Sequence, residues 1–299
     1  QMQSSLLPFL SHTICGCVLF MCFLAVQLAL VRYIATMDDR VPTTPSGNDD
    51  TIHGLEKIDG RILLTGFESL TRNATDLSKC NKFGEGWTKI LFDCEGMAVK
   101  IPNFDGQNMR DCWYYADSHV KFRKASCRRQ LIRSLLKDTS TMVELQGDPM
   151  IPQLLGYHFD GKNSLEAEKY QVFTQLGRPI DIIFLLSIDW DERMSIVRDI
   201  VHFLRRNGDK HFGDLRRQQF VIIDNKPMLI DFGDIEESSN STASSMHHSK
   251  RIYDEFIDRY MWAGAPITAT KSLRHLERIA KSGSLTLESL SASLDSLTR

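Results

Sequence analysis

The stretch from residue 211 to residue 233 constrains this chain more than any other part of it. Two acids, Asp214 and Asp231, are separated by an apolar run at 220–223, a Lys-Pro turn and a second apolar run at 228–230. Two short apolar runs joined by a tight connection predict a β-hairpin. Because a hairpin returns the chain to its starting point, we expect the two carboxylates to come together in the fold.

Bulk composition identifies the broad class of protein. The 299 residues are 42% hydrophobic and 25% charged, and the formal net charge is −2. These values are typical of a globular protein that is long enough to bury a substantial core. The near-neutral charge balance argues against nucleic acid as a partner.

The N-terminal residues have a different character. Residues 1–31 carry no charged side chain, and 14–31 are apolar apart from Gln27. An apolar run of this length is at the short end of the ~17–25 residues of a membrane-spanning helix. A cleaved signal peptide, with an apolar region of about 7–15 residues, is the alternative. We expect a membrane anchor at 1–36, followed by a flexible stem at 37–60 that contains Pro42, Pro45 and Gly47.

Four of the seven cysteines lie beyond the apolar segment: Cys80, Cys94, Cys112 and Cys127. An even number is consistent with two disulfides in an oxidising compartment, and four cysteines allow three pairings. Cys80 and Cys94 are equidistant from Trp87, so a hairpin centred there would place them opposite each other. A bridge between them would leave Cys112 to pair with Cys127.

Two glycosylation sequons, at Asn73 and Asn240, also suit a chain in the secretory pathway. Together with the anchor and the cysteines, they predict a type II membrane protein of the Golgi or endoplasmic reticulum. The body would lie in the lumen, or be secreted after cleavage.

The body of the chain changes character near its middle. From residue 61 to about 176 it consists mainly of short strand-like runs, with a helix predicted over 121–137. After Asp189, which resembles a helix cap, apolar residues recur at helical spacing up to Leu204, and two further helices are predicted at 271–280 and 287–297. We therefore expect an α+β, bilobal domain at 61–299, with an N-lobe at about 61–176, a C-lobe at about 177–299 and a ligand cleft between them.

Two features of the strand-rich half suit phosphate binding. Gly84-Glu85-Gly86 lies between two strand runs, where residues without Cβ allow backbone N–H groups to approach phosphate oxygens. A simple hairpin turn is the alternative. Lys100 ends the next apolar run, where a lysine would project into the cleft and pair with the phosphates of a nucleotide.

The hairpin of the other half carries the reacting groups. Asp214 can orient the hydroxyl that accepts a phosphoryl group, and Gln219, five residues later, can hold a metal. Arg216 can neutralise the transferring group. Asp231, in Asp-Phe-Gly, would bind Mg²⁺ or Mn²⁺. The order and spacing of these residues, with Lys100 upstream, predict a protein kinase-like domain that uses ATP.

Several segments resemble the vertebrate lonesome kinase family of secretory-pathway kinases. They are Gly-Glu-Gly-Trp-Thr-Lys at 84–89, Ala-Val-Lys at 98–100, Leu-Leu-Gly-Tyr at 154–157, Gln-Phe-Val at 219–221 and Leu-Ile-Asp at 229–231. The resemblance covers about 67–299. It implies a protein kinase fold, ATP with a divalent metal, and phosphorylation of secreted or lumenal proteins, with tyrosine as the acceptor.

The resemblance also assigns the remaining parts of a nucleotide site. The backbone of Gln175 and Leu176 would face the adenine, and either Phe173 or Thr174 would gate the pocket. Asp138 is the candidate partner of Lys100 on the regulatory helix, where kinases carry the longer glutamate.

Other features leave alternatives open. Phe212-Gly213 precedes Asp214 where kinases carry His-Arg, and no Ala-Pro-Glu follows Gly233. A catalytically impaired pseudokinase, which would serve as a lumenal scaffold, is therefore the alternative to an active kinase. A lumenal kinase that acts on glycans is another.

Overall fold

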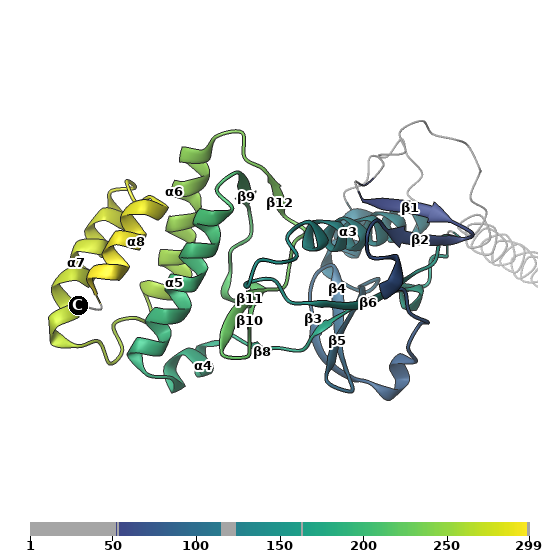
Figure 1. Cartoon of the computed structure of the whole chain (residues 1–299), viewed down its shortest axis with the longest axis horizontal. Coiled ribbons are helices and arrows are strands. Elements are labelled where there is room, and N and C mark those ends of the chain that lie inside the picture. The colour runs from purple at the N-terminus through teal and green to yellow at the C-terminus, as the bar shows by residue number, and fades with distance from the viewer. Residues whose placement is uncertain (1–51, 53, 115–123, 163, 298–299) are drawn as a thin grey trace, which may run out of the picture.

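The fold combines a sheet-rich half and a helical half, which lie side by side along the long axis of the molecule (Figure 1). The structure is a computed structural model and describes residues 52, 54–114, 124–162 and 164–297. The predicted anchor at 1–36 lies outside these residues. Within the described ranges, no helix is both long and apolar enough to span a membrane.

A small hairpin opens the described chain. It consists of β1 (Leu55–Ile58) and β2 (Arg61–Leu64), which pair in antiparallel fashion. The hairpin crosses the predicted boundary between stem and domain at residue 60, so regular structure begins before residue 61.

A five-stranded antiparallel sheet, in the order β3-β4-β5-β7-β6, forms the core of the sheet-rich half. Its strands are β3 (Asn81–Glu85), β4 (Lys89–Cys94), β5 (Met97–Pro102), β6 (Leu154–Phe159) and β7 (Tyr170–Gln175). Glu95 and Gly96 close the turn between β4 and β5 with φ of 55° and 81°. Positive φ at both central positions is the conformation that suits a tight hairpin.

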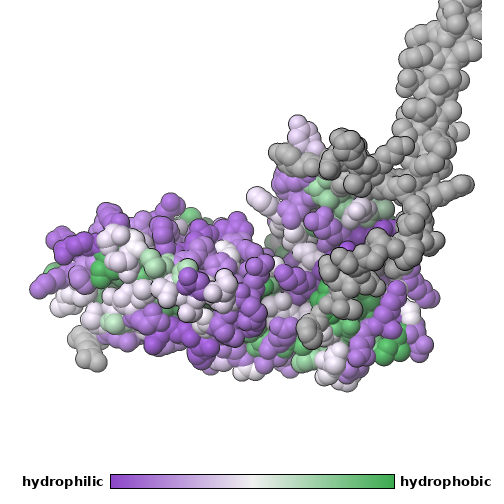
Figure 2. Space-filling view, turned by 90° about the horizontal axis from the view of Figure 1, so that it is seen from above, coloured by the Kyte–Doolittle hydropathy of each residue, from purple (hydrophilic) through white to green (hydrophobic). Residues whose placement is uncertain are grey.

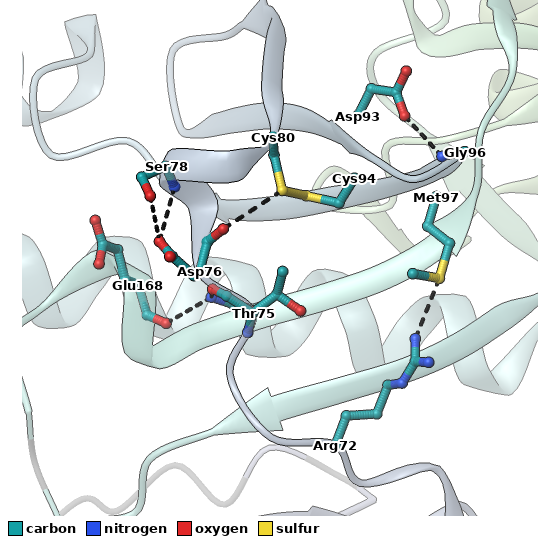
Figure 3. Close-up of a disulfide and its surroundings, with 11 residues drawn as sticks. Arg72, Thr75, Asp76, Ser78, Cys80, Asp93, Cys94, Gly96, Met97 and Glu168 are labelled. Atoms are coloured by element: carbon teal, nitrogen blue, oxygen red, sulfur yellow. Dashed lines mark hydrogen bonds between the residues drawn. A yellow bond between two sulfur atoms is a disulfide. The ribbon is translucent and has the colours of Figure 1, made fainter.

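The two faces of this sheet have different partners. Val99 and Phe173, which lie opposite each other in β5 and β7, pack on one face against Leu77 from the segment before β3. A disulfide between Cys80 and Cys94 ties that segment to the end of β4, with the Cα atoms 4.7 Å apart (Figure 3). The opposite face carries Ala98 and Lys100, because successive side chains alternate between faces.

A long helix, α3 (Lys124–Glu144), lies against the sheet-rich half (Figure 1). Its apolar stripe is buried, as the sequence predicts, and includes Leu131, Ile132, Leu135 and Leu136. The helix extends seven residues beyond its predicted end at 137. A second disulfide joins Cys112 of α2 (Gln107–Tyr114) to Cys127 of α3, with the Cα atoms 5.9 Å apart. Both disulfides have the pairing that the hairpin argument favoured.

The helical half contains α4 (Ile182–Ser187), α5 (Trp190–Arg206), α6 (Ser241–Ile252), α7 (Ile267–Lys281) and α8 (Leu287–Ser296). The side chain of Asp189 caps α5 by accepting the N–H of Glu192 at 2.7 Å, as the sequence predicts. A single π-helical turn, Tyr253–Ile257, continues α6. On the visible face in Figure 2, hydrophilic residues cover most of this half, whereas more apolar residues gather on the sheet-rich half.

Short strands between the two halves bring the two acids together. They are β8 (Arg178–Pro179), β9 (Lys210–Phe212), β10 (Phe220–Ile223), β11 (Lys226–Leu229) and β12 (Ile235–Glu237). The predicted hairpin is β10–β11, closed by Asp224 and Asn225 at φ of 49° and 61°. The turn was predicted at Lys226-Pro227, but these two residues are the first of β11. Because β9 pairs with β12 and β10 pairs with β11, the loops at 213–219 and 230–234 lie side by side.

Candidate functional site

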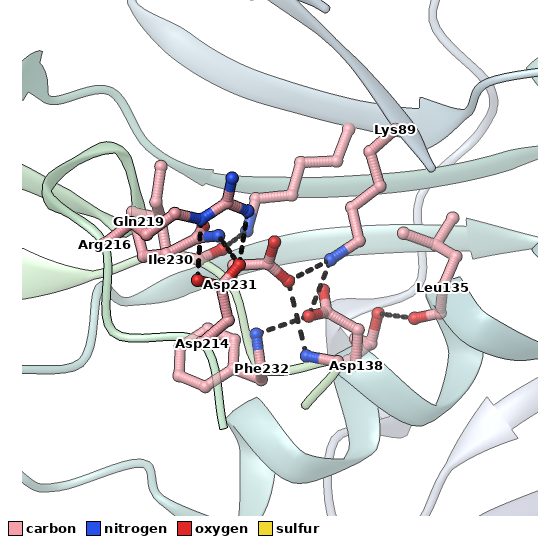
Figure 4. Close-up of polar contacts among 12 residues, drawn as sticks. Lys89, Leu135, Asp138, Asp214, Arg216, Gln219, Ile230, Asp231 and Phe232 are labelled. Atoms are coloured by element: carbon pink, nitrogen blue, oxygen red, sulfur yellow. Dashed lines mark hydrogen bonds and ion pairs between the residues drawn. The ribbon is translucent and has the colours of Figure 1, made fainter. Parts of the chain in front are cut away.

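A buried cluster of charges connects the sheet, α3 and the loop after β11 (Figure 4). The ammonium of Lys89, at the start of β4, lies 2.8 Å from Asp138 of α3 and 2.7 Å from Asp231. Asp138 also accepts the backbone N–H of Phe232 at 2.6 Å. One carboxylate on α3 therefore fixes both a strand lysine and the Asp-Phe-Gly segment.

Lys100 makes a contact that the sequence did not predict. Its ammonium donates to the carbonyl oxygen of Ile230 at 2.6 Å and lies 5.8 Å from the centre of the Phe232 ring. In the described part of the chain it makes no ion pair within 4.0 Å, and Asp138 pairs with Lys89 instead. The sequence assignment of Asp138 as the partner of Lys100 therefore does not hold in this structure.

The charges of this cluster shift the pKa values of its own members. Burial acts to lower the pKa of Lys89, but the charges of Asp138 and Asp231 outweigh it and raise that pKa above its ordinary value. Burial acts to raise the pKa of Asp231, but Lys89 and Lys100 hold it far below the usual range for a carboxyl group. Burial lowers the pKa of Lys100, which Asp138 offsets only in part. Asp231 is therefore a firmly ionised group at neutral pH.

Asp214 is held from the loop on which it lies. Its Oδ1 accepts from Nε of Arg216 at 2.7 Å, and its Oδ2 accepts from Arg216 and from the amide nitrogen of Gln219 at 2.7 Å (Figure 4). Arg251, from α6, approaches to 4.0 Å. Burial acts to raise the pKa of Asp214, but the hydrogen bonds from Arg216 and Gln219 prevail and lower it. An ionised Asp214 is suited to accept a hydrogen bond from a hydroxyl group.

The donor set around Asp231 is compatible with a divalent cation. Mg²⁺ binds oxygen ligands and commonly takes only one or two groups from the protein, with phosphate and water completing its coordination. The carboxylate of Asp231 is 37% exposed. Gln219 uses its amide nitrogen on Asp214, which directs its carbonyl oxygen to other partners. Asp231 and Gln219 would thus supply two oxygen ligands, although the described residues contain no group of three His, Cys, Asp or Glu side chains arranged for a metal.

The glycine turn is held from the end of β5. Asn103 is completely buried and donates through its side chain to the carbonyl oxygen of Gly86 at 2.7 Å and to Glu85 at 3.2 Å. Its backbone N–H donates to the carbonyl oxygen of Thr88 at 2.8 Å. Gly84 lies in β3 just before this turn. Asn103 therefore anchors the segment that the sequence identified as a phosphate-binding loop.

The strand β7 ends at the residues predicted to face an adenine. The side chain of Gln175 accepts the backbone N–H of Gln153 at 2.9 Å, and Leu176 follows it, partly buried. Thr174 lies opposite Ala98, and it therefore shares the face that carries Lys100. Phe173 lies on the opposite face, within the small core beneath the Cys80–Cys94 disulfide. Of the two residues left open by the sequence, only Thr174 is on the side of the charged cluster.

The segment before Asp214 has its own support. Phe212 is buried, and its backbone N–H donates to Nε2 of His248 at 2.9 Å. Gly213 donates its N–H to the carbonyl oxygen of Asp234 at 2.9 Å, and a Cβ at this position would lie 2.2 Å from the Asp234 carboxylate. A side chain in place of Gly213 would therefore have to displace the carboxylate of Asp234.

His248 is confined to its neutral form. Burial, together with the neighbouring His211 and His247, lowers its pKa to about 3. Because a backbone N–H can only donate, the Nε2 atom that faces Phe212 must carry a free lone pair. The imidazole therefore serves as a hydrogen-bond acceptor that supports the loop leading to Asp214.

We expect His248 to make the folding stability depend on pH in weakly acidic solution. The unfolded chain takes up a proton on this imidazole near its ordinary pKa of 6.5, whereas the folded chain does so only near pH 3. Stability is therefore lost progressively as the pH falls from about 6.5 towards 3, and the loss reaches about 2 kcal/mol at pH 5. His248→Gln keeps an acceptor for Phe212 but does not titrate, so it should reduce the difference in unfolding free energy between pH 7 and pH 5, measured with urea.

The matched control is His202→Gln on α5, where the side chain is exposed. We expect this variant to keep the wild-type pH dependence. If His248→Gln and the wild type lost the same free energy between pH 7 and pH 5, the buried neutral imidazole would not be the cause.

Three residues of this region escaped the sequence interpretation. Lys89 entered the sequence analysis only as the last residue of the segment at 84–89, although strand alternation places it on the same face as Lys100. Asn103 and His248 belong to no motif, and only their buried contacts reveal them. The two sequon asparagines, Asn73 and Asn240, are exposed, and Asn240 caps α6 by accepting the N–H of Ala243.

Comparisons with known proteins identify a distant curated relative. No protein-family profile matches the chain. Over 180 residues it is 24% identical to the human extracellular tyrosine-protein kinase PKDCC, a match that covers 57% of this chain and 35% of that protein. The match thus spans about a third of that relative's length. The resemblance to secretory-pathway kinases inferred from the sequence is confirmed by this match, which supports a kinase-like protein.

Solved structures of WbdD are also similar. One, a complex with the kinase inhibitor LY294002, has a TM-score of 0.44 at 14% identity and covers 72% of this chain and 44% of that one. Another has a TM-score of 0.45 at 13% identity, with 72% and 45% covered.

Proposed function

We propose that this chain is an atypical protein kinase of the secretory pathway, which transfers the γ-phosphoryl group of ATP to a protein hydroxyl group, with tyrosine as the acceptor. The observation that carries the proposal is the convergence of Asp214, Asp231 and the buried Lys89–Asp138 pair between the two halves of the fold. Under this proposal the two halves are the N-lobe and C-lobe of a kinase fold. The donor nucleotide would bind where they meet.

Each residue has a role that its contacts allow. Asp214 would accept the hydrogen bond of the incoming hydroxyl group and orient its oxygen towards the γ-phosphorus. Arg216, which is 49% exposed, would turn from Asp214 to the transferring phosphoryl group. Asp231 and Gln219 would hold a Mg²⁺ or Mn²⁺ ion, which supplies charge neutralisation when it is bound. The hydroxyl oxygen forms the new bond to the γ-phosphorus as the bond from that phosphorus to the β,γ-bridging oxygen breaks. ADP leaves with the bridging oxygen, and the hydroxyl proton passes to Asp214 and from there to solvent.

The cellular location and the class of substrate can be proposed from the disulfides and from the extracellular relative. The two disulfides favour an oxidising lumen, and PKDCC, the relative described above, is an extracellular tyrosine-protein kinase. We therefore propose secreted or lumenal proteins as substrates, Golgi or endoplasmic reticulum membranes as the location, and the apolar segment at 14–31 as the membrane contact.

A second candidate function has a specific observation in its favour. Both carboxylate oxygens of Asp214 are already engaged by Arg216 and Gln219. A carboxylate has about four acceptor directions, so if Arg216 does not leave, only about one of them is left for a substrate. The chain would then act as a nucleotide-binding scaffold without turnover. A kinase that acts on glycan hydroxyl groups would use the same donor site with a different acceptor.

The test uses the full chain purified in mild detergent, with labelled ATP, Mn²⁺ or Mg²⁺, and a tyrosine-containing protein acceptor. We expect the wild type to transfer label, and Asp214→Asn to reduce the rate by about 10²-fold, because an oriented acceptor for the hydroxyl proton is lost. Acid hydrolysis of the product should release phosphotyrosine. Asp224→Asn, in the exposed turn of β10–β11, is the matched control.

The outcomes separate the candidates. Transfer that persists unchanged in Asp214→Asn would rule out the assignment of this acid. A thermal shift with nucleotide but no transfer would favour the scaffold, and label recovered only in glycans would favour the glycan kinase.

A further inference from the structure

The two lysines of the site share one face of the sheet. In the register of β4 and β5, Lys89 lies opposite Pro102, and Leu91 lies opposite Lys100. Side chains two residues apart in a strand point the same way, so Lys89 and Lys100 both project towards α3 and the Asp-Phe-Gly segment. Position on the sheet therefore does not decide which of the two lysines would bind the phosphates of a nucleotide.

Their contacts do decide. Lys89 bridges Asp138 and Asp231 at 2.8 and 2.7 Å, and Asp231 is the carboxylate proposed to hold the metal. Lys89 follows the glycine turn in the chain, and its carbonyl oxygen accepts the N–H of Gly86 at 2.8 Å, which closes that turn. A cation beside the acid that would hold the metal is suited to bind the oxygens of a donor's β- and γ-phosphates.

Lys100 is committed elsewhere. It is 2% exposed, its ammonium donates to the carbonyl oxygen of Ile230, and it lies beneath the ring of Phe232. Lys89 is also buried, at 7% exposed, but its partners are two carboxylates, of which Asp231 is partly exposed. The partner of Lys100 is a backbone carbonyl oxygen, and pulling this ammonium away would leave both groups without a partner out of contact with water. This lysine fixes the residues on either side of Asp231.

We propose, as a deepening of the proposed function, that Lys89 binds the phosphates of the donor nucleotide, and that Lys100 is a positioning residue that holds Ile230 and Phe232 so that Asp231 faces the cleft. The two lysines thus divide the tasks for which the sequence suggested Lys100 alone. Asp138 orients Lys89 and, through the N–H of Phe232, couples it to the loop that Lys100 holds.

The test compares ATP with adenosine, which lacks phosphates, on the full chain in detergent. We expect Lys89→Met to weaken ATP binding by roughly 10–100-fold, the loss of one charge-assisted contact, while the affinity for adenosine stays within about 3-fold. Lys89→Arg, which keeps the charge, should recover much of the preference for ATP. Lys226→Met, at an exposed position of β11, is the matched control.

Lys100→Met should behave differently. Affinity for ATP should stay within about 3-fold of the wild type, but the transfer rate at saturating ATP should fall by at least about 10-fold, because Asp231 loses its support. A lysine with only a structural role would not separate the rate from the affinity in this way. If Lys100→Met fails to fold, Lys100→Gln, which keeps a donor for Ile230, gives the same comparison.

The outcomes distinguish this inference from the proposed function. Loss of the preference for ATP in Lys100→Met but not in Lys89→Met would overturn the inference and leave the kinase proposal intact. A wild type that binds ATP in the expected pattern without transferring phosphate would support Lys89 as the phosphate-binding lysine and contradict the kinase proposal. A wild type that binds neither ligand would overturn both.

Discussion

Asp231→Asn is expected to lower the rate of phosphoryl transfer by at least about 10³-fold while the protein stays folded. The change keeps the shape of the side chain, so an oxygen can still accept the N–H of Gly233 and lie near Lys89. It removes the negative charge that would hold the metal and, with it, the neutralisation of the phosphates in the transition state. Lys89 retains Asp138 as its partner, which limits the loss of stability.

The measurement is the transfer rate over a range of Mn²⁺ concentrations, beside the thermal unfolding temperature. We expect Asp231→Asn to need much more metal and still to fall short of the wild-type rate. Asp224→Asn makes the same chemical change in an exposed turn and should alter neither quantity. Wild-type activity in Asp231→Asn at ordinary metal concentration would show that this acid is not a metal ligand.

Asp138→Ala is expected to destabilise the protein by about 3–5 kcal/mol. The substitution removes one partner of a buried ion pair and leaves Lys89 with Asp231 alone. Breaking a buried pair from one side costs this much because a charge remains without full compensation away from water. The backbone N–H of Phe232 loses its acceptor as well. Because the same carboxylate fixes the Asp-Phe-Gly segment, transfer activity should fall together with stability.

Urea unfolding of Asp138→Ala, Lys89→Ala and the double variant forms a cycle that isolates the pair. We expect the double variant to be less destabilised than the sum of the single ones by about 0.5–3 kcal/mol, because the two groups share one interaction. Lys137→Ala, at the neighbouring exposed position of α3, controls for effects on the helix. Strict additivity would mean that Lys89 and Asp138 do not stabilise each other.

Local patterns explain why much of the fold could be predicted. The hairpin around 224–225, the capped helix after Asp189 and the buried stripe of α3 all depend on residues within one or two turns of each other. The pairing of Cys80 with Cys94 could be anticipated for the same reason, because one hairpin contains both. The predicted boundary at residue 60 falls within the turn between β1 and β2.

Contacts across long sequence distances could not be predicted in this way. Asn103, which bonds the glycine turn, and His248, which bonds Phe212, belong to no sequence motif. Their roles depend on contacts between elements that are separate in the sequence. The choice between Phe173 and Thr174 needed the register of β5 against β7, which a single strand does not reveal.

The sequence determined the chemical types and the order of the site: a glycine turn, a lysine at the end of a strand, an acid on a helix, and two acids around a hairpin. These follow from short-range periodicity and turn chemistry. Only the tertiary structure decided that Asp138 pairs with Lys89 and that Lys100 binds the backbone of Ile230. That choice depends on how α3 packs against the sheet, where a shift of a few ångströms changes which ammonium a short carboxylate can reach.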